Sequence, residues 1–146
     1  MSHRVYVAFG DSITDGYGVP RGFVSFLTLK ISGAIPGLDL ATFNTGMSGD
    51  TSQGGLYRLG RDVLNHNPDI VTINFGVNDA FSGISEQKFS ENLGEMVSRI
   101  REAGCDRILL LSCEVIPEDW AEQQVLPYWD AMRAVAEETG SVYADV

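Results

Sequence analysis

The chain has 146 residues, of which 44% are hydrophobic and 21% charged, so it suits one globular domain with a single core. Its formal net charge is −10, and a surface of that sign repels nucleic-acid phosphates and anionic lipid. No apolar stretch is long enough to cross a bilayer, and the N-terminus shows no signal-peptide pattern. We therefore expect no nucleic-acid partner, no integral membrane segment and a cytoplasmic location, although a mature secreted form would look the same.

Apolar runs that are typical of strands alternate with helical patterns along the whole chain. The strand-like runs cover residues 5–9, 40–44, 70–75, 107–111 and 142–144. Apolar residues at helical spacing lie between them, in residues 23–31, 56–64, 85–103 and 122–139. This alternation predicts an α/β fold in one domain, with a parallel sheet and helices on both of its faces.

Three polar loops follow the first three predicted strands. They contain Gly10-Asp11-Ser12, Gly46-Met47-Ser48-Gly49-Asp50 and Gly76-Val77-Asn78-Asp79. In a parallel sheet these loops share one edge, where ligands bind. A serine hydroxyl with N–H donors from a glycine-rich turn and an asparagine is the set that acyl transfer needs. The sequence therefore predicts a nucleophile and an oxyanion hole at this edge.

The same loops resemble the first three sequence blocks of the GDSL, or SGNH, hydrolases. The resemblance rests on Gly10-Asp11-Ser12, Ser48-Gly49-Asp50-Thr51 and Gly76-Val77-Asn78-Asp79, and it runs from about Tyr6 to the end of the chain. It implies a flavodoxin-like three-layer fold with strand order 2-1-3-4-5. It also implies serine-dependent hydrolysis of a small ester or thioester, by an esterase, lysophospholipase or thioesterase, or alternatively by a carbohydrate O-acetyl esterase. No metal or organic cofactor is implied, and the oligomeric state stays open.

The resemblance assigns a role to individual residues. Ser12 resembles the nucleophile, and the backbone N–H groups of Ser12 and Gly49 with the Asn78 amide resemble the oxyanion hole. We interpret Asp11 as a structural residue that accepts backbone N–H groups, and Asn44 as a brace for the same loop. Residues on neighbouring loops are candidates for the substrate pocket: Tyr17, Phe81, Ile84, Glu114, Val115 and Ile116.

The family's fourth block, an Asp-x-x-His pair that supplies the general base, has no match. Only His3 and His66 are present, and each precedes a predicted strand. A six-residue strand spans about 20 Å at 3.3 Å per residue. A general base must lie within about 3 Å of its proton donor, or one water away. We therefore expect both histidines to be surface residues at the wrong edge of the sheet.

Crossover handedness gives a second reason to expect a missing segment. Right-handed crossovers put the first long helix on one face and the next three on the other. Strands three to five then lie bare beside the first helix, although parallel sheets are normally covered on both faces. We expect the sequence to be part of a longer protein whose tail carries the Asp-x-x-His pair and a last helix.

A non-catalytic binding module is an alternative from a different class. A flavodoxin-like edge also suits a phosphate or a flavin, and Gly49-Asp50-Thr51 opens a helix that offers N–H groups to an anion. Against this alternative, the three loops contain no lysine and several carboxylates. The acidic edge favours the hydrolase.

Overall fold

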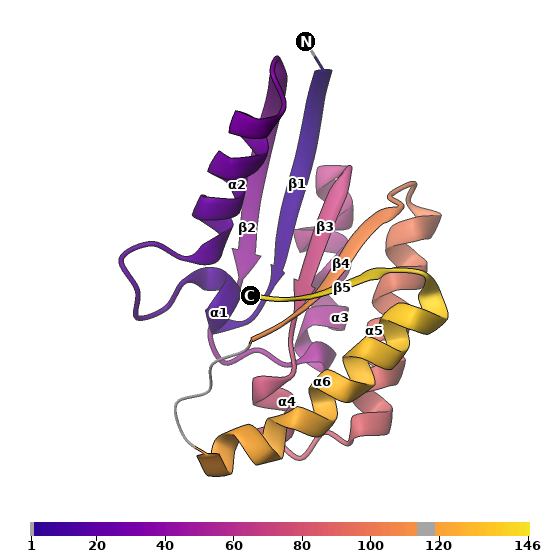
Figure 1. Cartoon of the computed structure of the whole chain (residues 1–146). Coiled ribbons are helices and arrows are strands. Elements are labelled where there is room, and N and C mark those ends of the chain that lie inside the picture. The colour runs from indigo at the N-terminus through magenta and orange to yellow at the C-terminus, as the bar shows by residue number, and fades with distance from the viewer. Residues whose placement is uncertain (1, 114–118) are drawn as a thin grey trace.

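The computed structural model describes residues 2–113 and 119–146, and its centre is a parallel five-stranded sheet (Figure 1). The strands are β1 (Ser2–Gly10), β2 (Leu38–Gly46), β3 (Ile70–Asn74), β4 (Arg107–Ser112) and β5 (Val142–Asp145). Their order across the sheet is β2-β1-β3-β4-β5, and every neighbouring pair is parallel. The predicted α/β class and the strand order 2-1-3-4-5 are confirmed.

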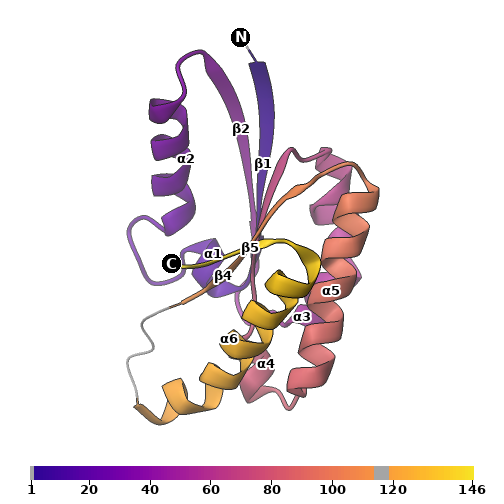
Figure 2. The same ribbon diagram turned by 45° about the vertical axis from the view of Figure 1, so that its right-hand side comes forward.

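The helices form a layer on each face of the sheet (Figure 2). Helix α2 (Phe23–Ala34) covers β1 and β2 on one face, while α3 (Ser52–Asp62), α5 (Glu86–Glu102) and α6 (Asp119–Thr139) cover the other. Short helices α1 (Ser12–Asp15) and α4 (Val77–Phe81) follow β1 and β3, and the 3₁₀ turn η1 (Leu64–His66) follows α3. None of the described helices is long and apolar enough to cross a membrane.

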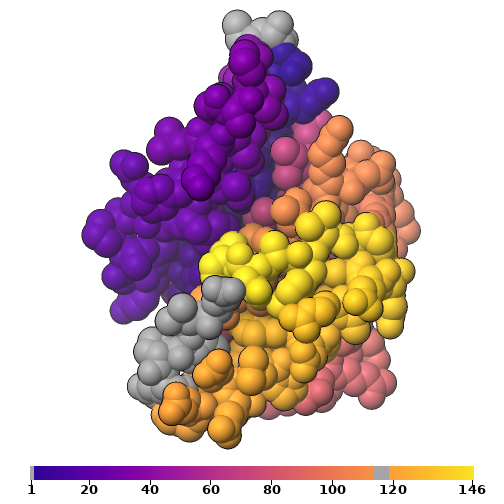
Figure 3. Space-filling view, viewed as in Figure 1, coloured from indigo at the N-terminus to yellow at the C-terminus, as the bar shows by residue number. Residues whose placement is uncertain are grey.

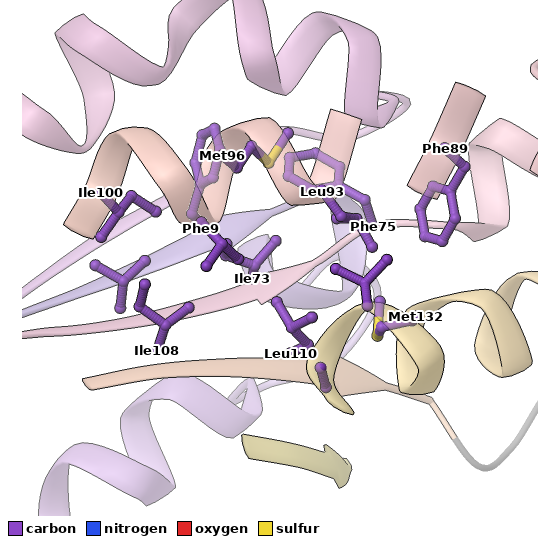
Figure 4. Packing of buried hydrophobic residues seen from close by; sticks show 14 of the residues in the cluster. Phe9, Ile73, Phe75, Phe89, Leu93, Met96, Ile100, Ile108, Leu110 and Met132 are labelled. Atoms are coloured by element: carbon purple, nitrogen blue, oxygen red, sulfur yellow. The ribbon is translucent and has the colours of Figure 1, made fainter. Parts of the chain in front are cut away.

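The main core lies between the sheet and the layer of α3, α5 and α6 (Figure 4). Alternate residues of β1 divide between the two faces: Phe9 joins the main core, while Tyr6 packs with Val24 of α2 on the other face. The buried side of α5 keeps the helical spacing predicted from the sequence, with Phe89, Leu93, Met96, Val97 and Ile100 inside.

Several helix boundaries differ from the prediction. Helix α6 begins at Asp119 rather than Glu122 and continues through Pro127. Proline removes one helical hydrogen bond, but buried Val125 and Trp129 on either side hold the helix against the core. Helix α4 was not expected at all, because its five residues are too few to show a period.

An apolar groove remains on the α2 face of the sheet. Its volume is about 420 Å³, and it is lined by Leu27 and Ile31 of α2 and by Ile70, Leu109 and Val142 of the sheet. In Figure 3 the surface is hollowed between the α2 side of the molecule and β5. The groove lies over the part of the sheet that crossover handedness predicts to have no helix on this face. That a further helix covers it stays a prediction.

Candidate active site

The register of the sheet brings the three polar loops together. Gly10 of β1 is paired with Gly46 of β2 on one side and with Asn74 of β3 on the other. The three strands therefore end level, and the loops that follow them start from one line at the carboxyl edge. Asn74 strengthens this edge, since its side chain donates to the main-chain carbonyl of Leu111 in β4 at 2.6 Å.

Ser12 is the first residue of α1, directly after the end of β1. Asp11 is the N-cap of this helix, and its carboxylate accepts the backbone N–H of Ile13 at 3.0 Å. The backbone N–H of Ser12 has no partner inside the helix, because the first N–H groups of a helix lack acceptors there. Among the residues that the structure describes, none forms a hydrogen bond with the Ser12 hydroxyl.

Gly49 lies in the turn after β2 with φ of +81°, a conformation that glycine adopts without strain. Asn44 links this segment to the nucleophile helix. Its side-chain amide donates to the Thr14 carbonyl at 2.8 Å, and its side-chain oxygen accepts the N–H of Gly46 at 3.0 Å. The structure therefore places Asn44 between the end of β2 and α1.

Asn78 lies in α4 and reaches back to both other loops. Its side-chain amide donates to the main-chain carbonyl of Asp50, the neighbour of Gly49, at 2.9 Å. The same nitrogen is 3.5 Å from the Asp11 carboxylate. The amide of Asn78 is thus held beside the segments that carry Ser12 and Gly49.

A buried polar network that sequence reasoning missed holds α4 in place. The fully buried Asp79 accepts hydrogen bonds from the backbone N–H of Ser52 at 3.0 and 3.1 Å and from the Ser52 hydroxyl. That hydroxyl also accepts the Asn92 amide from α5 at 3.0 Å. The one available sequence signal was Asn92, a polar residue on the otherwise apolar side of α5.

The site is acidic, and two of its carboxyl groups, those of Asp11 and Asp79, have raised pKa values. Burial raises the pKa of Asp11 to about 6, with the charges of Asp79 and Asp50 adding to the effect and the Ile13 N–H opposing it. Burial also raises the pKa of Asp79, against the hydrogen bonds from Ser52. An edge with this much negative charge is a poor place for a phosphate, which weighs against the anion-binding alternative.

The predicted pocket residues lie in different surroundings. Tyr17 is 79% exposed and lines a groove of about 410 Å³ whose lining also includes Ile13, the neighbour of Ser12. Phe81, three residues after Asn78, meets Trp120 edge to face, with ring centroids 5.8 Å apart. Ile84 is half-buried and packs against the main core. Glu114, Val115 and Ile116 lie outside the described residues.

Both histidines lie at the amino-terminal edge of the sheet, away from Ser12. His3 stands near the start of β1 and contacts the Asp39 carboxylate at 2.9 Å. His66 lies in η1, before β3, with its ring stacked on Phe43 at a centroid distance of 4.1 Å. Neither histidine of the chain is positioned to take a proton from Ser12.

A model of the GDSL-like Lipase/Acylhydrolase family matches residues 8–146. The chain belongs to this family. It is 34% identical over 116 residues to Esterase TesA of Pseudomonas aeruginosa, an alignment that covers 78% of this chain and 56% of that protein. It is 32% identical over 106 residues to an arylesterase of Vibrio mimicus, covering 71% of this chain and 52% of that protein.

A comparison with a solved structure shows the same similarity at the level of the fold. The crystal structure of TesA superposes with a TM-score of 0.82 and 28% identity, covering 96% of this chain and 77% of the TesA chain. The resemblance predicted from the three motifs is therefore confirmed, both in sequence and in fold. The chain spans about half the length of the curated relatives that it matches.

Proposed function

We propose that this chain carries the nucleophile and the oxyanion hole of a serine hydrolase that acts on small-molecule esters or thioesters. One observation supports this most strongly. The Asn78 amide is hydrogen-bonded to the carbonyl of Asp50, beside Gly49, in a sheet whose register puts Ser12 at the same edge. The relatives that are named as esterases point to the same chemistry.

In the first half of the proposed reaction, Ser12 Oγ attacks the acyl carbon while its proton passes to a general base. The carbonyl π electrons move to the oxygen, and the N–H groups of Ser12 and Gly49 and the Asn78 amide stabilise the negative charge. The tetrahedral intermediate then collapses to an acyl-Ser12 ester. The alcohol or thiol leaves with the proton that the base returns to it.

In the second half, water attacks the acyl-Ser12 ester in the same way. The base takes a proton from the water, and the oxyanion is held by the same donors. Collapse of this intermediate breaks the bond to Ser12 Oγ, which regains its proton, and the carboxylic acid is released. The histidine that serves as base is proposed to come from an Asp-x-x-His pair in a segment after Val146, since His3 and His66 are out of reach.

The test is covalent labelling of Ser12 by a fluorophosphonate, followed by mass spectrometry of the labelled peptide. We expect label on Ser12 in the 146-residue chain, none in Ser12→Ala, and unchanged labelling in the matched control Ser98→Ala, which removes an exposed serine of α5. A chain without its base retains only about 10³–10⁴-fold catalysis over water, so labelling is expected to be slow.

Free imidazole tests the proposed missing base. We expect labelling of Ser12 to accelerate with imidazole concentration, because a small base can enter where a histidine is absent. A longer natural chain with the Asp-x-x-His pair is expected to label fast without imidazole. Labelling that is equally fast in both chains would show that no further base is needed, and labelling at another residue would overturn the assignment of Ser12.

A further inference from the structure

Arg58 of α3 is a buried arginine directly behind the candidate oxyanion hole. It is 7% exposed, and two carboxylates balance its charge: Nε lies 2.7 Å from Asp50 Oδ2, and Nη1 lies 3.0 Å from Asp62 Oδ2. Its guanidinium also lies over the Phe9 ring at 4.6 Å. A buried charge is costly unless it is paired and hydrogen-bonded. The remaining contacts of the Arg58 guanidinium show which segments of the chain it holds together.

Two of these contacts are with main-chain carbonyls at the ends of neighbouring strands. Nη2 donates to the carbonyl of Gly10 at 2.9 Å, and Nη1 donates to the carbonyl of Thr45 at 2.7 Å. Gly10 is two residues before Ser12 in β1, and Thr45 is in β2, just before the turn that carries Gly49. The guanidinium therefore ties the nucleophile loop to the oxyanion loop.

A third connection runs through Asp50 to the side-chain donor. The Asp50 carboxylate, held by Arg58, also accepts its neighbour Thr51 N–H at 2.9 Å. The main-chain carbonyl of Asp50 accepts the Asn78 amide at 2.9 Å. One planar group thus holds the strand end before Ser12, the neighbour of Gly49 and, through that neighbour, Asn78.

We propose that Arg58 is a positioning residue that sets the relative geometry of the three oxyanion donors without touching the substrate. The proposal rests on the proposed function. An oxyanion hole works only when its donors lie within 2.7–3.1 Å of the developing charge, and a misplacement of about 1 Å can cost about 100-fold in rate. Lysine cannot substitute, because a single ammonium cannot make the four separate contacts of the planar guanidinium fork.

A purely structural role is the alternative, and α3 offers a matched control. Arg61 lies one turn further along the helix and also pairs with Asp62, at 2.6 Å, but its side chain is 70% exposed and, among the described residues, hydrogen-bonds only to Asp62. Arg58→Lys and Arg61→Lys therefore make the same chemical change on the same helix. Only the first removes the connection between the loops.

The experiment measures fluorophosphonate labelling of Ser12 over a range of reagent concentrations, which separates the maximal labelling rate from the concentration giving half of it. For Arg58→Lys we expect the maximal rate to fall at least about tenfold while the half-saturating concentration changes less than about twofold. Arg61→Lys should match the wild type in both. In Arg58→Ala, added methylguanidinium should restore part of the rate, and it should leave the wild type unchanged.

Amide hydrogen exchange supplies a second readout that does not depend on labelling. Residues 47–51 should exchange faster in Arg58→Lys than in Arg61→Lys, while the core strands exchange alike in both. The proposal is overturned if folded Arg58→Lys labels at the wild-type rate, or if only the half-saturating concentration changes. A wild-type chain that does not label at Ser12 defeats the proposed function itself, and the proposal with it.

Discussion

The side-chain amide of Asn78 donates a hydrogen bond to the main-chain carbonyl of Asp50 at 2.9 Å. An asparagine amide carries two hydrogens, so this bond leaves one for a second acceptor. The same nitrogen lies 3.5 Å from the Asp11 carboxylate, a distance at which a hydrogen bond is weak. We therefore propose that one amide hydrogen fixes Asn78 and that the other serves an oxyanion.

Replacing Asn78 by alanine removes that available donor. We expect kcat for hydrolysis of a p-nitrophenyl ester, measured with imidazole present, to fall about 10²–10³-fold, which is the usual cost of losing one oxyanion donor. KM should change little, because the donor acts mainly in the transition state. Asn65→Ala, at an exposed asparagine of η1, is the control and should leave kcat unchanged. An Asn78→Ala enzyme with wild-type kcat would remove Asn78 from the proposed site.

Much of the fold followed from the sequence because each signal is local. The run around Phe9 is apolar on both faces of its strand, the run around Ile73 is rich in β-branched residues, and α5 shows a clear helical period from Phe89 to Ile100. Alternation of such elements implies a parallel sheet with few possible topologies. Element boundaries were less predictable: the helical pattern indicated residues 122–139, whereas α6 begins at Asp119 and continues through Pro127, with Trp129 packed against the core.

The candidate site was predictable only as far as its motifs reached. Ser12, Gly49 and Asn78 stand in recognisable blocks, but the groups that hold them do not. From the sequence alone, Arg58 would be placed on the exposed side of an amphipathic helix. Only tertiary packing brings it to Gly10, 48 residues away along the chain. Contacts of that kind depend on how α3 docks on the sheet, and no local pattern specifies this.

The buried carboxyl of Asp11 predicts a pH dependence of stability. Its folded-state pKa of about 6 lies above the ordinary value of 3.8. Between about pH 4 and 6 the folded state binds more protons than the unfolded state, so the unfolding free energy falls as pH rises. Above about pH 6, Asp11 is ionised in both states and the unfolding free energy falls no further. We expect the total loss from Asp11 to be about 2–3 kcal/mol. Asp79, whose pKa is raised in the same direction, adds to this trend.

Asp11→Asn tests this, because asparagine still offers an oxygen to the Ile13 N–H but carries no charge. Urea unfolding at pH 4 to 8 should show the variant gaining stability over the wild type as pH rises from 4 to 6, with a constant difference above. Asp106→Asn, which removes one negative charge at an exposed position, is the control for the change in net charge. If the difference in unfolding free energy between the wild type and Asp11→Asn does not vary with pH, the raised pKa of Asp11 is contradicted.

Gly76 begins the loop that carries Asn78, and we expect Gly76→Ala to destabilise the protein by about 2–4 kcal/mol. Its φ is +136°, and an added Cβ would lie 2.5 Å from Cζ3 of the buried Trp129. Gly94→Ala is the matched control: this helical glycine of α5 has open space around it, so alanine should stabilise by about 0.5–1 kcal/mol. Urea denaturation measures both. If both variants change the unfolding free energy in the same direction, this description of the two positions is wrong.

We propose that Phe81 contacts the substrate, because it is 45% exposed, shares α4 with Asn78 and packs edge to face with Trp120. We expect Phe81→Ala to raise KM for an aryl ester about five- to tenfold, through loss of apolar contact, while kcat changes much less. Leu126→Ala is the control, since it truncates an exposed apolar residue of similar size on α6. For a methyl ester, which has no ring to contact Phe81, the KM of the variant should equal that of the wild type. An equal rise in KM for both esters would indicate that α4 itself has shifted, and that Phe81 does not line the pocket.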